Sequence, residues 1–124
     1  MGADIDFELL SLFRKDSLEM TEEDRDKIRQ ACEETSHRQI LITHSTDTMA
    51  DTAESLQSLT GKVIVLTGAM APARFRETDA IFNVGTAIGA LQCLDDGVYL
   101  AMNGQIFKAG EVRKHREAKK FEAI

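Results

Sequence analysis

Three short apolar runs, separated by segments with helical spacing, organise the middle of the chain. They lie within residues 39–43, 62–66 and 98–102, and each has a continuous apolar centre instead of an alternation with polar positions. Runs of this length and composition are typical of strands that are buried on both faces of a parallel sheet. We therefore predict three core strands, with residues 62–66 as a central one.

Helical spacing appears before the first predicted strand and between the strands that follow. The first helix should cover residues 22–34, because Thr21 and Asp24 resemble a capping box and acidic residues fill the first turn. A second helix should start at a cluster of hydroxyl residues and cover residues 47–59. A third should be capped at residues 78–79 and end before residue 95.

The two ends of the chain are less clear than its centre. Asn103-Gly104 is a strong hairpin signal that joins the third strand to residues 105–108. The tail at 111–124 is basic and permits a helix, and the apolar residues 7–13 fit either a strand or a helical turn. Helix and strand alternate, which predicts a three-layer α/β fold with a mostly parallel sheet, flanking helices and a β-hairpin near the carboxyl end.

Two glycines and two cysteines lie in predicted helices and affect how those helices could pack. Gly85 and Gly89 indicate either close packing of the third helix against a neighbour or glycines that are merely tolerated. Cys32 and Cys93 have neither a zinc spacing nor a disulfide framework. We interpret both as free, buried thiols inside helices.

Length and charge narrow the classes of function. A chain of 124 residues is expected to form one domain, residues 1–124. Its 15 basic and 21 acidic residues give a net charge of -6, which opposes binding to nucleic acid. The amino terminus lacks the pattern of a signal peptide, and no apolar run approaches the ~18 residues of a membrane span, so a cytoplasmic protein with no membrane partner is expected.

Three loops at strand ends should converge at the carboxyl edge of such a sheet, where α/β folds bind ligands. They are residues 45–48, residues 67–69 and a turn that carries Lys114. Thr46, Asp47 and Lys114 would supply a hydroxyl, an orienting carboxylate and an amine, as nucleophilic chemistry requires. From the pattern alone, Thr46 and Asp47 are more often helix caps and Lys114 a solvated side chain.

A family resemblance changes these odds. Residues 42–49 (Ile-Thr-His-Ser-Thr-Asp-Thr-Met) closely resemble a signature of the L-asparaginase/glutaminase amidohydrolases, usually His-Gly-Thr-Asp-Thr-Met. Residues 66–72 resemble the family's Thr-Gly-Ala-Met-Arg-Pro loop, and residues 78–83 resemble the helix start after it. Residues 102–114 are similar to its hairpin and lysine-bearing turn, and residues 15–21 to its Asp-Ser segment. The similarity covers nearly the whole chain in the family's order.

The resemblance implies a role for five residues. Thr46 would be the second active-site threonine, and Asp47 its acidic partner, which also binds the α-amino group of the substrate. Lys114 would complete the relay. Ser17 would contact the substrate's α-carboxylate, and the backbone carbonyl of Ala69 would accept a hydrogen bond from the side-chain amide.

The implied reaction is hydrolysis of L-asparagine to L-aspartate and ammonia, without a metal or an organic cofactor. The partner is thus a small-molecule substrate, L-asparagine or L-aspartate. The family's first strand, which ends in Thr-Gly-Gly-Thr, has no counterpart in this sequence, and neither does the family's second domain. We therefore expect a truncated amino-terminal domain that is weakly active or inactive alone. The alternative is a non-catalytic module that binds an amino acid or self-associates as a homo-oligomer.

Three further positions qualify the resemblance. The only tyrosine, Tyr99, lies in a predicted core strand and not in a mobile loop. Ser45 replaces the family's glycine: either its Cβ strains a backbone that needs a positive φ or a close approach to substrate, or the serine caps the next helix. His44 belongs to the signature and is interpreted as a structural hydrogen-bonding residue.

Overall fold

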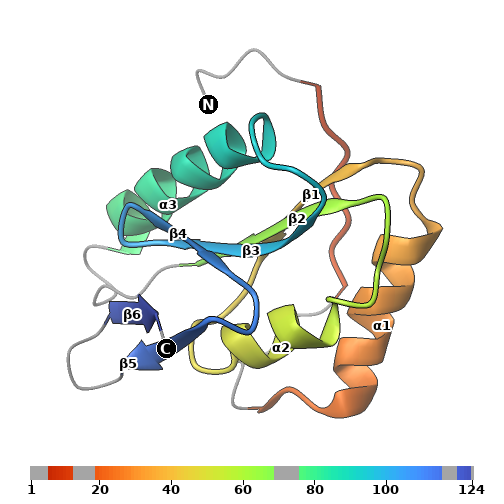
Figure 1. Cartoon of the computed structure of the whole chain (residues 1–124), viewed down its shortest axis with the longest axis horizontal. Coiled ribbons are helices and arrows are strands. Elements are labelled where there is room, and N and C mark those ends of the chain that lie inside the picture. The colour runs from red at the N-terminus through yellow and green to blue at the C-terminus, as the bar shows by residue number, and fades with distance from the viewer. Residues whose placement is uncertain (1–5, 13–18, 69–75, 116–119, 124) are drawn as a thin grey trace.

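A four-stranded sheet lies between two helical layers (Figure 1). The computed structural model of the chain describes residues 6–12, 19–68, 76–115 and 120–123. The strands are β1 (Gln39–Thr43), β2 (Val63–Thr67), β3 (Gly97–Met102) and β4 (Gln105–Lys108), in that spatial order. β1, β2 and β3 run parallel, whereas β4 is antiparallel to β3. The predicted fold class is confirmed.

The strands divide their side chains between the two faces of the sheet. Ile64 and Leu66 point into one apolar cluster, and Val63 and Val65 point into another. All five residues of β2 are buried, because helices cover both faces of this central strand. β1 is only half-buried at its centre and is an edge strand among the described elements.

The first helix, α1 (Glu22–Glu34), matches its prediction at both ends. The backbone N–H of Asp24 donates to Thr21 Oγ1, and the N–H of Thr21 donates to the Asp24 carboxylate, so the capping box is complete. Ile28 and Cys32 are buried on its inner face.

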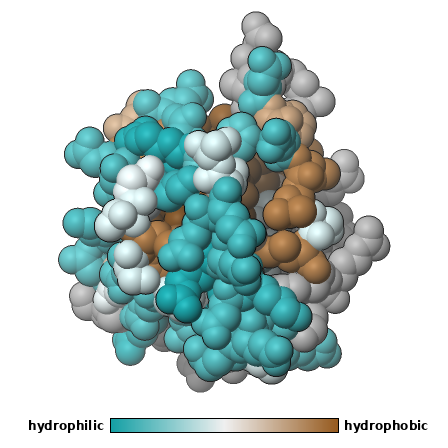
Figure 2. Space-filling model, turned by 90° about the vertical axis from the view of Figure 1, so that its right-hand side faces the viewer, coloured by the Kyte–Doolittle hydropathy of each residue, from teal (hydrophilic) through white to brown (hydrophobic). Residues whose placement is uncertain are grey.

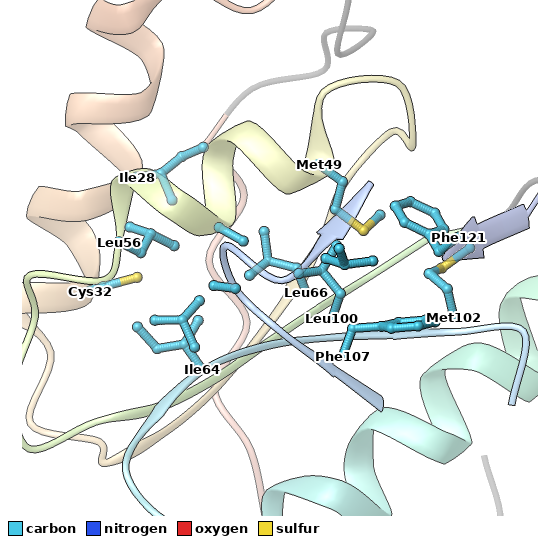
Figure 3. Packing of buried hydrophobic residues seen from close by; sticks show 14 residues of the cluster. Ile28, Cys32, Met49, Leu56, Ile64, Leu66, Leu100, Met102, Phe107 and Phe121 are labelled. Atoms are coloured by element: carbon cyan, nitrogen blue, oxygen red, sulfur yellow. The ribbon is translucent and has the colours of Figure 1, made fainter. Parts of the chain in front are cut away.

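The larger core lies between the sheet and the layer that holds α1 and α2 (Met49–Ser55), as Figure 3 shows. Met49 and Leu56 from the α2 region pack against Leu66 and Leu100 of the sheet. The smaller core lies on the opposite face, under α3 (Arg76–Leu91). The layered order of helices, sheet and helix determines where the ends of the strands come together. The candidate site lies at that place.

Two helices differ from the predicted bounds. α2 ends at Ser55, and the N–H of Leu56 donates to Ala53, three residues back, so the chain tightens into turns before residue 59. α3 begins at Arg76, so residues 78–79 lie within its first turn and do not precede it. The helix start predicted there is wrong, because residues that favour helix extend it towards the amino end.

The predictions for the two glycines and the two cysteines are confirmed only in part. A Cβ on Gly85 or Gly89 would meet open space, so these glycines are tolerated and do not allow close packing. Cys32 is buried and free, as predicted, but Cys93 is exposed. The prediction for Cys93 is wrong because α3 ends at Leu91, and Cys93 lies in the turn beyond it.

Two hairpins complete the carboxyl end. Asn103 (φ 55°) and Gly104 (φ 72°) form the predicted tight turn between β3 and β4. The described part of the tail, residues 111–115 and 120–123, does not form the helix that its composition permits. Instead, β5 (Val112–His115) and β6 (Lys120–Ala123) pair antiparallel, because this lets Val112 and Phe121 bury their side chains in the larger core.

The described residues before α1 carry exposed apolar side chains. Residues 6–12 form neither helix nor strand, so both interpretations of residues 7–13 are wrong over the part that is described. Phe7, Leu9 and Leu10 are 69 %, 87 % and 70 % exposed. Figure 2 shows apolar surface along one side of the face that carries α1. Within the described parts of the chain, no helix has the length and apolarity needed to cross a bilayer.

Candidate active site

The candidate site starts where β1 ends and the chain turns towards α2. The N–H of His44 donates to the carbonyl of Thr67 at 2.9 Å, which extends the β1–β2 ladder by one residue and fixes the start of the loop. Thr46 follows in the loop and is only 8 % exposed. The N-cap of α2 is Thr48, whose side chain makes no capping hydrogen bond. Thr46 and Asp47 are therefore not the caps that their pattern alone favoured.

Lys114 reaches this loop from the far end of the sequence. Its Nζ donates to Thr46 Oγ1 at 2.8 Å and to Asp47 Oδ1 at 2.6 Å. The side chains of Lys114 and Asp47 are 15 % and 26 % exposed, so the ion pair is largely shielded from water. The structure thus brings together the hydroxyl, carboxylate and amine that were predicted to meet. Lys114 lies in strand β5, however, and not in a turn.

The second loop of the site meets the first through a glycine. A Cβ on Gly68 would clash with the carbonyl oxygen of His44 and press on Met49. Only glycine therefore lets the end of β2 pass this close to the β1–α2 loop. Ser17 and Ala69, the two predicted contacts to the substrate, lie outside the described residues.

This geometry suits proton transfer. A hydroxyl 2.8 Å from an amine, which is itself paired with a carboxylate, can pass a proton along the row of three groups.

A model of the family described as "Asparaginase, N-terminal" matches residues 2–124. The chain belongs to the asparaginase family.

A curated relative gives the same assignment over part of the chain. It is a glutaminase-asparaginase from Acinetobacter glutaminasificans, which is 38 % identical over 80 residues. That match covers 60 % of this chain and 24 % of the relative, so it spans about a quarter of the relative's length. The family assignment rests on the longer match.

Ser45, where the asparaginase family usually has glycine, causes no backbone strain. Among the described residues, the one non-glycine residue with a positive φ is Asn103, so Ser45 has an ordinary φ. The capping interpretation of Ser45 is also wrong, because the N-cap of α2 is Thr48, three residues later, and the helix begins at Met49. Whether its Cβ approaches a substrate stays a prediction.

His44 of the asparaginase signature is held by hydrogen bonds at both ring nitrogens. Nδ1 lies 2.6 Å from the carbonyl oxygen of Ser45, and Nε2 lies 2.9 Å from Thr52 Oγ1. Burial lowers the pKa of the imidazole, the bond to Ser45 partly opposes this, and the charge of Arg25 lowers the pKa further. These contacts are those expected of a structural hydrogen-bonding residue.

Three residues near the site had no role in the sequence-based prediction. Arg25 and Thr52 are buried and hydrogen-bonded to each other. Asn83 is fully buried and donates through Nδ2 to the carbonyl of Gly68 at 2.7 Å. The sequence pattern could have indicated that Arg25 is buried, because it lies three residues before Ile28 on the inner face of α1.

In the described parts of this asparaginase-family chain, no cluster of three or more His, Cys, Asp or Glu side chains could hold a metal ion.

Proposed function

We propose that this chain is an amidohydrolase domain that acts on L-asparagine, with Thr46, Asp47 and Lys114 as its proton relay. The observation that carries this proposal is the pair of short hydrogen bonds from Lys114 Nζ to Thr46 Oγ1 and Asp47 Oδ1. Membership of the asparaginase family supports it, since that family provides the substrate class.

The relay fits the proton bookkeeping of amide hydrolysis. Water and L-asparagine give L-aspartate and ammonia, so the attacking nucleophile must lose a proton and the leaving nitrogen must gain one. An ammonium paired with Asp47 has no free lone pair, so Lys114 accepts a proton from Thr46 only as it passes one on. Asp47 is also partly exposed, which leaves room for it to bind the substrate's α-amino group.

The 124-residue chain alone should turn over slowly or not at all. Its sequence contains no Thr-Gly-Gly-Thr segment, and the family's usual nucleophile belongs to that segment. Residues of a catalytic unit do not contribute independently, so loss of the nucleophile removes nearly all activity even when the relay is intact. Binding of L-aspartate should survive, because Asp47 belongs to this chain.

The test is ammonia release from L-asparagine and L-glutamine by the wild-type chain, Thr46→Ala and the control Thr86→Ala, at a half-buried position of α3. We expect at most a trace from the wild type that Thr46→Ala abolishes and Thr86→Ala retains. Release at an ordinary enzymatic rate would overturn the expectation of low activity. A trace that Thr46→Ala leaves unchanged would overturn the role of the relay.

Self-association is a second candidate property, favoured by the exposed apolar side chains of residues 6–12. We expect light scattering to find a dimer or larger species whose mass falls when Leu9 and Leu10 are both replaced by Ser. A monomer at all concentrations would contradict this expectation without affecting the proposed relay.

A further inference from the structure

A row of hydrogen bonds leads from α1 through α2 to the loop that carries Thr46. Arg25 Nε on α1 donates to Thr52 Oγ1 on α2 at 3.1 Å. Thr52 Oγ1 lies 2.9 Å from His44 Nε2, and His44 Nδ1 lies 2.6 Å from the carbonyl oxygen of Ser45. Thr52 is fully buried and Arg25 is 8 % exposed, so little water competes for these bonds.

The chemistry of the groups limits the direction of the bonds in this row. A carbonyl oxygen only accepts, so His44 Nδ1 must carry a hydrogen. A guanidinium only donates, so Thr52 Oγ1 accepts from Arg25 and has its own hydrogen left for His44 Nε2. A neutral ring with hydrogen on Nδ1 fits this row, because its Nε2 then accepts the hydrogen of Thr52. Its lowered pKa, caused first by burial and then by the charge of Arg25, agrees with a neutral ring.

The row ends on the peptide group that precedes Thr46. The carbonyl of Ser45 and the N–H of Thr46 belong to one planar unit, so fixing the carbonyl fixes the orientation of the unit. One residue earlier, the N–H of His44 is bonded to Thr67. The loop is thus held at two successive points before Thr46, whose hydroxyl then meets Lys114 at 2.8 Å.

We propose that Arg25, Thr52 and His44 are positioning residues that aim the Thr46 hydroxyl at Lys114. The hydrogen bonds described above link Arg25, Thr52 and His44 to one another and to the carbonyl of Ser45, so these residues act through the backbone and not on the reacting groups. The link to turnover rests on the proposed function. The link to the orientation of Thr46 does not, and it can be measured in the resting protein.

The test is nitrogen NMR of the His44 ring and of the Thr46 backbone amide, together with calorimetric titration of L-aspartate. The variants are Thr52→Val, which removes the hydroxyl at nearly constant shape, and Thr52→Ser, which keeps it. Wild type and Thr52→Ser should show hydrogen on Nδ1 alone. Thr52→Val should show a mixture of tautomers, a shifted Thr46 amide and about fivefold weaker binding of L-aspartate, as expected for the loss of one hydrogen bond.

Each outcome decides one part of the proposal. A wild-type ring with hydrogen on Nε2 overturns it, even if no variant folds. A Thr46 amide that does not move in Thr52→Val overturns the positioning role, whether or not the protein binds L-aspartate. If the wild type binds no L-aspartate, the proposed function fails, while the NMR result still stands for or against the positioning row. Should Thr52→Val not fold, Arg25→Lys, which lacks the Nε donor, gives the same readouts.

Discussion

Replacing Lys114 by Met should destabilise the fold as well as break the relay. The substitution keeps an unbranched side chain but removes the ammonium that bonds Thr46 and Asp47 at 2.8 Å and 2.6 Å. It also leaves the Asp47 carboxylate, 26 % exposed, without this counter-charge. Hydrogen bonds to charged groups contribute about 1.5–3 kcal/mol. Breaking a fully buried ion pair costs about 3–5 kcal/mol, and an exposed one at most about 1 kcal/mol.

The intermediate exposure of this pair places the expected loss at about 2 kcal/mol. With an unfolding entropy of about 2.1 cal/mol/K per residue, the melting temperature of a chain this size should fall by about 8 °C. The assay is thermal and urea unfolding followed by circular dichroism. The matched control is Lys108→Met, at an exposed position of β4, which should change stability by no more than about 0.5 kcal/mol.

A double-mutant cycle with Asp47→Asn tests whether the loss comes from the pair itself. The coupling energy should be about 1–2 kcal/mol, because the two side chains are in direct contact. A loss for Lys114→Met no larger than that of Lys108→Met, or a coupling near zero, would refute the account of this contact.

Two further predictions concern the surroundings of the relay. In urea unfolding, Gly68→Ala should lower the free energy of unfolding by about 1–3 kcal/mol, because its Cβ meets the His44 carbonyl. The control Gly89→Ala, which faces open space, should raise it by up to about 1 kcal/mol. Equal effects would contradict the close approach at Gly68. The pKa of His44 is lowered in the folded chain, so as the pH falls below about 6.5 the unfolded chain binds a proton before the folded chain does. Acidification through this window therefore lowers the free energy of unfolding. In urea unfolding at pH 5, 6 and 7, His44→Asn should flatten this dependence by at most about 1.4 kcal/mol per pH unit. Identical profiles for His44→Asn and wild type would be the contrary result.

Much of the sheet and the start of α1 could be predicted because the sequence patterns that indicate them are local. The continuous run of β2, the Thr21–Asp24 capping box and the Asn103-Gly104 turn each lie within a few residues, and each formed as expected. Such signals depend on backbone preference and on burial of one short segment.

The β5–β6 hairpin could not be predicted in the same way. Its sequence is basic and permits a helix, and the strands form because Val112 and Phe121 bury against a core built by distant residues. Tertiary packing of this kind overrides local propensity. The early end of α2 and the exposure of Cys93 likewise depend on how the chain turns after each helix.

The candidate site shows the same division. Thr46 and Asp47 stand out beside a strand end, but no spacing links them to Lys114, which lies 68 and 67 positions away. The expected convergence of loops at the carboxyl edge of the sheet suggested that link, the family resemblance strengthened it, and the structure places the three side chains together. Arg25 and Thr52 were missed because their contribution appears only when α1 and α2 pack against the loop.

The most direct test of the central claim is calorimetric titration of the chain with L-aspartate, compared between wild type, Asp47→Asn and the exposed control Asp51→Asn. If Thr46, Asp47 and Lys114 form an amino-acid site, the wild type and Asp51→Asn should bind L-aspartate in preference to D-aspartate. Asp47→Asn should then lose about tenfold or more in affinity, as expected when a charged contact is removed. Equal affinities for all three proteins, or no binding to the wild type, would contradict the claim.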